Sequence, residues 1–259
     1  MSTPDLIDTH CHLDAAEFDA DREAVAASAA AGGVGHIVIP AVERANFGAV
    51  AAVCREFPGC VPAYGIHPMY VDRAEPADLD ALRATLEREP AVAVGEIGLD
   101  RYLEARDDAL QEHYFVEQLR IARDFDLPVI LHVRRAIDPI LKQLRRIGVP
   151  GGIAHAFNGS RQQADEFIKL GFVLGFGGAM TYPRAARIRE LAATLPLEAI
   201  VLETDAPDIP PAWIAGGRNA PDQLPRIAAE LAALRNLPVA DIIAATSNNA
   251  RRVLPRLAR

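Results

Sequence analysis

The stretch Leu6-Ile7-Asp8-Thr9-His10-Cys11-His12-Leu13 is a short apolar run that carries two histidines, and it predicts the first strand of the fold. Seven further short runs rich in Val, Ile, Leu and Gly follow it, at residues 36–42, 61–67, 91–99, 128–133, 152–157, 172–177 and 200–205. Near-continuous apolar runs of this length are typical of parallel strands that are covered on both faces. The sequence therefore predicts eight parallel strands.

Segments with a helical period separate the predicted strands. Ile137, Ile140, Leu141 and Leu144, for example, recur at i, i+3, i+4 and i+7, which gives a helix one buried face. Eight strands that alternate with helices predict a closed TIM-type (β/α)8 barrel of the α/β class. A doubly wound open sheet is the alternative fold, but it does not require eight strands. Because one such barrel typically takes ~250 residues, we expect residues 1–259 to form a single domain.

Composition and charge exclude several classes of protein. The chain has 27 Lys and Arg against 35 Asp and Glu, and this net charge of −8 repels nucleic acid over most of the surface. Three cysteines without a CxxC pair argue against a disulfide framework and against a thiolate zinc site. Residues 1–5 do not begin a secretion signal, and the sequence has no run of about eighteen apolar residues. We therefore expect a cytoplasmic protein with no membrane partner and no obligate protein partner.

Five of the seven histidines lie at or near the C-terminal ends of the predicted strands, namely His10, His12, His67, His132 and His155. Glu96 and Asp205 occupy the same kind of position on the fourth and eighth strands. Active sites of TIM-type barrels are built at this end of the strands. Because residues two apart on a strand share a face, Asp8, His10 and His12 should point together. We therefore expect imidazoles and carboxylates to converge at one mouth of the barrel.

Six of these side chains have the chemistry of metal ligands, namely His10, His12, Glu96, His132, His155 and Asp205. Burying them together without an ion would be energetically expensive. They are too many for one tetrahedral zinc, whereas two divalent metal ions that share a bridging carboxylate and a hydroxide would use them all. Glu96 is the natural bridge, since no lysine lies at a strand end to take that role. Such ligands accept zinc, magnesium, manganese or nickel, so the sequence does not identify the metal.

These residues lie in motifs that resemble the TatD family of metal-dependent hydrolases and deoxyribonucleases. The motifs are Asp8-Thr9-His10-Cys11-His12, Gly65-Ile66-His67-Pro68, Gly95-Glu96-Ile97-Gly98-Leu99-Asp100, Leu131-His132, His155-Ala156-Phe157-Asn158-Gly159-Ser160, Leu202-Glu203-Thr204-Asp205-Ala206-Pro207 and Asn248-Asn249-Ala250-Arg251. They follow one another in the family's order from about Leu6 to Leu254, which is essentially the whole chain.

The resemblance implies a barrel with two divalent ions, one held by His10, His12, Glu96 and Asp205 and the other by Glu96, His132 and His155. It further implies hydrolysis of phosphodiester bonds of DNA, as by an exonuclease, so that nucleic acid would be the partner of the site as its substrate. Asp205 would then orient or deprotonate the attacking water.

The metal ligands alone leave other reactions open. The same hydroxide can attack the carbonyl carbon of a carboxylic ester or amide, such as an aminoacyl ester on RNA. A binding protein that keeps the metals without turnover is a further alternative, against which the intact Asp205 argues. The sequence does not choose between DNA, RNA and a small ester, and it does not determine the polarity of an exonuclease or the oligomeric state.

Three further residues are candidates for roles beside the metals. Arg134 follows His132 by two residues and should face the same mouth, where a guanidinium suits bidentate phosphate recognition. His67 either contacts the substrate or its leaving group, or is a structural histidine; the family's second histidine after this His-Pro pair is Met69 here. Glu203 either orients a ligand histidine or forms a buried structural hydrogen bond.

Overall fold

The computed structural model describes residues 6–258, so residues 1–5, on which the expectation about a secretion signal rests, lie outside it. Eight parallel strands form one sheet in the order β1 to β8, with each strand paired to the next along the chain. Their bounds are β1 (Leu6–Asp8), β2 (Val34–Pro40), β3 (Cys60–Tyr64), β4 (Ala93–Asp100), β5 (Val129–Arg134), β6 (Gly152–Ala154), β7 (Phe172–Phe176) and β8 (Ile200–Leu202). The predicted eight strands and barrel are confirmed.

The last and first strands meet through backbone hydrogen bonds just beyond their ends. Thr9 N donates to Leu202 O at 3.1 Å, and Asp205 N donates to His10 O at 2.8 Å. These bonds bring the segments after β8 and β1 side by side and nearly close the barrel.

Several strands end earlier than the sequence analysis predicted. β1 ends at Asp8 instead of residue 13, β3 ends at Tyr64 instead of residue 67, and β8 ends at Leu202 instead of residue 205. The histidines and the aspartate expected at these strand ends therefore lie in the loops directly after them. Backbone hydrogen bonds still hold the first of these loops, since Cys11 N donates to Val38 O of β2 at 3.1 Å.

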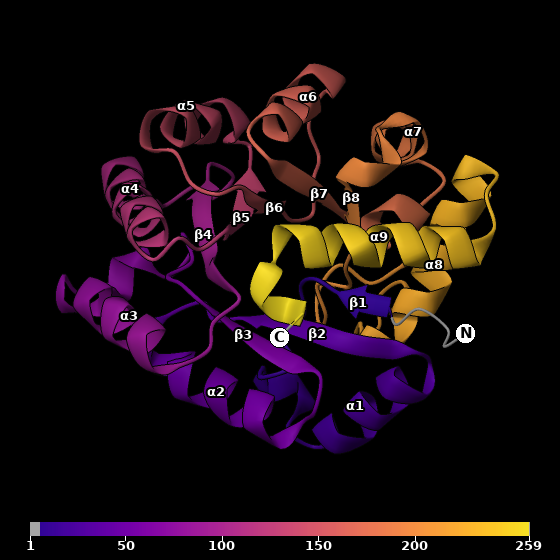
Figure 1. Cartoon of the computed structure of the whole chain (residues 1–259), viewed down its shortest axis with the longest axis horizontal. Helices are drawn as coiled ribbons and strands as arrows, with labels where there is room; N and C mark the ends of the chain where they lie inside the picture. Colours follow the sequence, from indigo (N-terminus) through magenta and orange to yellow (C-terminus); the bar gives the residue numbers. More distant parts are fainter. Residues whose placement is uncertain (1–5, 259) are drawn as a thin grey trace.

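A ring of helices surrounds the strands (Figure 1). The helices are α1 (Arg22–Ala31), α2 (Phe47–Glu56), α3 (Ala77–Arg88), α4 (Asp108–Asp124), α5 (Ile137–Ile147), α6 (Arg161–Lys169), α7 (Ala186–Thr194), α8 (Leu224–Arg235) and α9 (Val239–Val253). The periodic segment in α5 buries Ile140, Leu141 and Leu144 as predicted. No helix in the described part of the chain is long and apolar enough to cross a membrane.

The inside of the barrel is filled by one apolar side chain from each strand, together with residues of the C-terminal segment. The strand residues in this cluster are Ile7, Val38, Ala63, Ala93, Ile130, Ile153, Val173 and Val201. Ala250, Val253 and Leu254 pack into the same cluster from α9 and the residue that follows it. Asn249 of α9 donates to the carbonyl of Ile200, the first residue of β8, at 2.8 Å. The C-terminal helix therefore covers the N-terminal ends of the strands, and Figure 1 shows it lying across the barrel.

We predict that this covering helix contributes strongly to stability through Leu254, whose side chain is fully buried. Leu254→Ala should lower the free energy of unfolding by about 2–5 kcal/mol, because it leaves a cavity in the barrel interior. Urea denaturation followed by circular dichroism measures this loss. Leu237→Ala is the matched control, since Leu237 is 39% exposed and its truncation should change stability by at most about 0.5 kcal/mol. Equal effects of the two changes would show that packing of Leu254 into the barrel interior does not stabilise the fold.

Candidate metal centre

Seven side chains meet at the C-terminal ends of the strands, and we call them the histidine-carboxylate cluster: His10, His12, His67, Glu96, His132, His155 and Asp205. Glu96 lies in β4 and His132 in β5, whereas the other five follow β1, β3, β6 and β8. The six ligands that the sequence predicted are therefore brought together, and His67 joins them. Three overlapping triplets within the cluster have ligand atoms close enough to share a metal ion.

The two carboxylate oxygens of Glu96 face different imidazoles. Oε2 lies 3.1 Å from Nε2 of His10 and 3.7 Å from Nε2 of His12. Oε1 lies 2.9 Å from Nδ1 of His132 and 3.1 Å from Nε2 of His155. The carboxyl group is only 2% exposed. Burial alone would raise the pKa of Glu96, but the surrounding histidines hold it well below its usual range. A single buried carboxylate thus stands between two groups of imidazole nitrogens.

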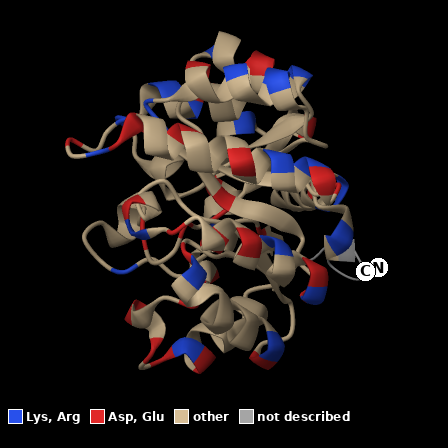
Figure 2. Cartoon of the chain, turned by 90° about the vertical axis from the view of Figure 1, so that its left-hand side faces the viewer, with Lys and Arg blue, Asp and Glu red and all other residues tan. Residues whose placement is uncertain are grey.

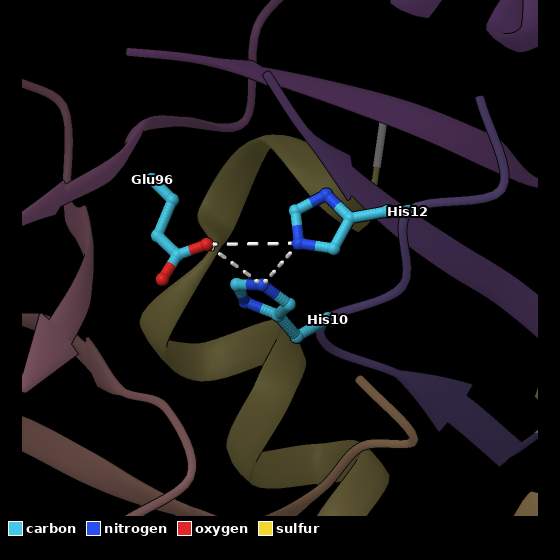
Figure 3. Close-up of side chains that lie close together, drawn as sticks. All are labelled: His10, His12 and Glu96. Atoms are coloured by element: carbon cyan, nitrogen blue, oxygen red, sulfur yellow. Dashed lines mark hydrogen bonds and ion pairs between the residues drawn. The ribbon is translucent and has the colours of Figure 1, made fainter. Parts of the chain in front are cut away.

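The first group is the pair His10 and His12, which Figure 3 shows converging with Glu96. Their Nε2 atoms are 3.2 Å apart. Burial and the neighbouring His155 lower the pKa of His10 well below its usual value, so its imidazole is neutral at neutral pH. Ligand atoms about 2.1 Å from a zinc-like ion are separated by roughly 3.0–3.4 Å, which agrees with the spacing of these nitrogens. The donor set and its spacing therefore fit a divalent ion.

The second group contains His132, whose ring is held at both nitrogens. Nδ1 faces Glu96, and Nε2 lies 3.0 Å from Oδ2 of Asp100, a fully buried carboxylate. Oδ1 of Asp100 accepts hydrogen bonds from the backbone N–H groups of Tyr102 (2.8 Å) and Leu103 (3.3 Å). A carboxylate on one nitrogen of a histidine leaves the lone pair of the other free for a metal. Asp100 thus orients His132 with Nδ1 toward the cluster.

His155 lies against His10, with stacked rings whose centroids are 3.8 Å apart. Its Nδ1 is 3.6 Å from Oε1 of Glu203, beyond a direct hydrogen bond. Glu203 instead accepts a hydrogen bond from Ala156 N at 2.5 Å, so it holds the residue after His155. Any side chain at Gly175 would collide with this carboxylate, because a Cβ there would lie 2.1 Å from Oε2 of Glu203. Glu203 therefore fixes the loop that carries His155.

His67 enters the cluster as a hydrogen-bond donor. Its Nε2 lies 3.3 Å from Oε1 of Glu96, and its Nδ1 accepts a hydrogen bond from the N–H of Met69 at 3.1 Å. Burial lowers the pKa of His67 to about 4, so the ring is neutral at neutral pH. With Nδ1 acting as an acceptor, the proton of the neutral ring is assigned to Nε2, which faces the cluster.

Asp205 lies near both imidazole groups and is the more accessible of the two carboxylates in the cluster. Its Oδ1 is 3.5 Å from His10 Nε2 and 3.9 Å from His155 Nδ1. The side chain is 13% exposed, compared with 2% for Glu96. Burial raises the pKa of Asp205 to about 6, although His155 and His12 lower it. Its backbone has a φ of +60°, which aspartate tolerates better than most residues.

Asp8 does not join the cluster, and the expectation that it would point with His10 and His12 was wrong. Its Oδ2 accepts a hydrogen bond from the hydroxyl of Thr204 at 2.6 Å, and its Oδ1 accepts one from Thr204 N at 3.0 Å. Because β1 ends at Asp8, the alternation of side chains along a strand does not extend from Asp8 to His10. Asp8 instead ties β1 to the segment after β8.

The cluster opens into a cleft of about 1500 Å³. Arg134 lines it as an exposed side chain at the end of β5, with its guanidinium carbon 4.0 Å from the ring centroid of Tyr102. Arg135 lies over the same ring at 4.6 Å. Arg187 also lines the cleft, and its guanidinium donates two hydrogen bonds to Oδ1 of Asn158. Within residues 6–258, none of these three arginines forms an ion pair with a carboxylate.

Four residues of the site were not predicted from the sequence: Asp100, Tyr102, Arg135 and Arg187. They differ in how far the sequence could have indicated them. Asp100 and Tyr102 stand at or next to the end of the motif at residues 95–100, so that motif could have indicated them. Arg135 follows Arg134 directly. Arg187 lies on α7 with no motif around it, and only the fold brings it to the cleft.

In Figure 2, basic and acidic residues are interspersed along the helices of the face shown. With a net charge of −8, the molecule attracts a phosphate chain only where cations are concentrated locally. Arg134, Arg135 and Arg187 in the cleft supply such a place.

The fold and the cluster define a class of barrel enzyme whose buried imidazoles and carboxylates are suited to holding metal. The chain matches the family model of TatD related DNases over residues 7–255. YjjV of Escherichia coli K12, named an uncharacterized metal-dependent hydrolase, is 44% identical over 247 residues, or 94% of this chain and 95% of YjjV. The 3'-5' ssDNA/RNA exonuclease TatD of Cronobacter sakazakii is 33% identical over 260 residues, or 96% and 97% of the two chains.

A crystal structure of YjjV from Escherichia coli superimposes with a TM-score of 0.93 at 42% identity, covering 96% of this chain and 98% of that one. The chain therefore belongs to the TatD family of metal-dependent hydrolases. The resemblance to the TatD family that the sequence motifs indicated is confirmed.

We predict that Asp100→Asn weakens metal binding by about 10- to 100-fold, the usual effect of losing such an outer carboxylate. Asp100 accepts from His132 with one oxygen and from backbone N–H groups with the other. Asparagine has only one acceptor oxygen and cannot make both sets of hydrogen bonds. Competition with a chromophoric chelator measures the affinity.

Asp107→Asn is the matched control. Its side chain accepts one hydrogen bond, from Leu110 N at 2.9 Å, and asparagine can accept that bond as well. If Asp100→Asn bound metal as tightly as the control, Asp100 would have no part in orienting His132.

Proposed function

We propose that this protein is a two-metal hydrolase that cleaves phosphodiester bonds of nucleic acid, most readily DNA, from an end of the strand. The observation that carries the proposal is the placement of Glu96, whose two oxygens face two separate groups of imidazoles. A carboxylate in that position suits a bridge between two ions.

The first ion would be held by His10, His12, Glu96 and Asp205, and the second by Glu96, His132 and His155. Divalent ions bound there would polarise the attacking water and neutralise charge that develops on the phosphoryl oxygens. The ligand atoms of His10, His12 and Glu96 lie close enough together to support the first ion. For the second ion, Glu96 groups with His132 and His67, whereas His155 groups with His10 and Asp205. Protein side chains would take the proton of the water and bind the substrate.

Asp205 would act as the general base. Of the two carboxylates in the cluster, that of Asp205 is the more exposed to the cleft. It lies near His10 of the first group of imidazoles and near His155. One oxygen of its carboxylate would orient the attacking water and accept its proton as the new bond to phosphorus forms. The bond from phosphorus to the leaving oxygen would break in the same displacement, and that oxygen would leave with a proton from a neighbouring donor or from solvent. Glu96, with both oxygens turned to imidazoles, is less able to serve.

His67 and Arg134 would bind the substrate. The Nε2–H of His67 faces the cluster and can donate to a phosphate oxygen or to the leaving oxygen. The guanidinium of Arg134 stands at the cleft rim without a carboxylate partner in residues 6–258 and can bind a phosphate in bidentate geometry. Relatives named as 3'-5' ssDNA/RNA exonucleases support nucleic acid as the substrate.

Hydrolysis of a carboxylic ester or amide, such as an aminoacyl ester on RNA, is the alternative. The cluster can serve this reaction equally well, because the attack on a carbonyl carbon needs the same base and the same ions. Within residues 6–258, the three arginines of the cleft have no carboxylate partner, which favours a substrate that carries phosphates over a small uncharged ester. They do not separate a phosphodiester from an aminoacyl ester on RNA, because both are attached to phosphates. The cytoplasmic location and the single domain stay predictions.

We predict that the metal-loaded protein hydrolyses a single-stranded oligonucleotide and that Asp205→Asn abolishes this turnover. The amide can still coordinate through its oxygen, so the variant should keep its fold and at least one ion, but it cannot take the proton of the water. Product analysis on single-stranded DNA, duplex DNA, RNA and simple esters, with metal content measured alongside, tests both parts. A variant that keeps near wild-type turnover with metal bound would remove Asp205 as the base.

We further predict that Arg134→Ala separates the two candidate substrates. It should lower kcat/KM for an oligonucleotide by the equivalent of about 1.5–3 kcal/mol, the worth of a charge-assisted hydrogen bond, with metal content unchanged. Hydrolysis of a small carboxylic ester should suffer less. Arg184→Ala serves as a control for lost positive charge, because Arg184 is exposed and does not line the cleft. Equal losses on both substrates, or none on the oligonucleotide, would contradict a phosphate-binding role.

A further inference from the structure

The side chains of Tyr102, Arg134 and Arg135 lie together at the rim of the cleft, and we call this group the stacking platform. The guanidinium carbons of Arg134 and Arg135 lie over the Tyr102 ring, 4.0 and 4.6 Å from its centroid. The two arginines are exposed, and Tyr102 is 49% exposed. Arg134, Arg135 and Tyr102 all line the cleft.

The two guanidinium groups of the platform form no ion pair with a carboxylate of residues 6–258, although the charge of Arg134 helps to lower the pKa of Asp100. By contrast, Arg101, close by in sequence, pairs with Asp108. The ring of Tyr102 is the contact that holds them in place. Flat guanidinium and aromatic faces that are left exposed in a cleft are the surfaces on which unpaired nucleobases stack.

The platform is tied directly to the histidine-carboxylate cluster. Asp100 accepts from Nε2 of His132 with one oxygen and from the N–H of Tyr102 with the other. Arg134 lies two residues beyond His132 on β5, opposite Asp100 of β4 in the register of the sheet. The same carboxylate therefore fixes both a ligand histidine and the platform, so a base on the platform belongs to a nucleotide close to the bond being cleaved.

The charge on the two sides of the cleft indicates where the strand runs. Asp14, Glu17 and Glu43 line the side built by the segments after β1 and β2. Arg134, Arg135 and Arg187 line the side of β5 and α7, together with one acid, Asp138 of α5. Because three arginines outnumber one carboxylate there, a phosphate chain would be attracted to this side, where the platform lies, rather than to the first side.

We propose that the stacking platform receives the nucleobase next to the scissile phosphate, with Tyr102 as the residue that makes the enzyme prefer an unpaired strand end. The inference rests on the proposed hydrolysis of nucleic acid and adds to it a determinant of specificity. A base in a duplex is already stacked and paired, so placing it on the platform requires unpairing that a single strand does not need. What the inference adds is the residue responsible and the need for a base near the attacked end.

The test uses single-stranded oligonucleotides in which one abasic nucleotide replaces, in turn, each of the first three positions from the end that is attacked. In the wild-type, metal-loaded protein, one of these positions should lower kcat/KM by roughly 5- to 100-fold, the range expected for one base stacked on an aromatic side chain. Tyr102→Leu should reduce this abasic penalty to less than about twofold, and Tyr102→Trp should preserve it.

Tyr70→Leu is the matched control. Tyr70 also lines the cleft and also carries an arginine over its ring, Arg73 at 4.9 Å, but that arginine pairs with Glu43 on the acidic side. The control should keep the abasic penalty in full. An unchanged penalty in Tyr102→Leu, or the absence of any penalty in the wild-type protein, would overturn the platform while leaving hydrolysis itself intact.

A binding measurement separates this inference from the proposed function. A short oligonucleotide with 2-aminopurine at its end should lose fluorescence on binding to the wild-type protein in EDTA, and less so with Tyr102→Leu. If no oligonucleotide is hydrolysed but quenching depends on Tyr102, the platform stands and the proposed function fails. Binding without quenching would overturn the platform.

Discussion

The rest of the site depends on one buried carboxylate, that of Glu96. A charge taken out of water at the mouth of a barrel is costly unless it is surrounded by groups that compensate it. Here the nitrogens of five imidazoles approach its two oxygens from four other segments, those that follow or form β1, β3, β5 and β6. This arrangement compensates the buried charge, and it explains why the histidines must come from so many different strands.

The packed interior of the barrel holds these groups in place. One apolar residue from each strand fills the interior, and the last helix covers the opposite end of the strands with Leu254 and its neighbours. The strands therefore act as a rigid base, while the chemistry is carried by short segments after them. Second contacts hold these segments further: Asp100 orients His132, Glu203 fixes the loop of His155, and Asp8 joins β1 to Thr204. Such supporting carboxylates are what keep a polar cluster preorganised.

The charges that line the cleft are unevenly distributed. Three arginines without carboxylate partners in the described chain stand on the side of β5 and α7 beside a single acid, Asp138, whereas Asp14, Glu17 and Glu43 line the side after β1 and β2. On a molecule with a net charge of −8, this local arrangement, rather than the overall field, would steer a phosphate chain. The ring of Tyr102 positions two of these charges, because the guanidinium groups of Arg134 and Arg135 lie against it.

The sequence by itself determined the eight-stranded barrel and the set of side chains that meet at its mouth, because parallel strands in a closed barrel place all their C-terminal ends together. It did not determine where the strands end. Alternation of side chains holds only within a hydrogen-bonded ladder, so it failed for Asp8, where β1 stops. Contacts between distant segments were decided by the tertiary structure alone: His67 against Glu96, Arg187 against Asn158, and the two arginines on Tyr102. Loop side chains have no fixed period, and their partners are set only when the fold brings separate loops to one cleft.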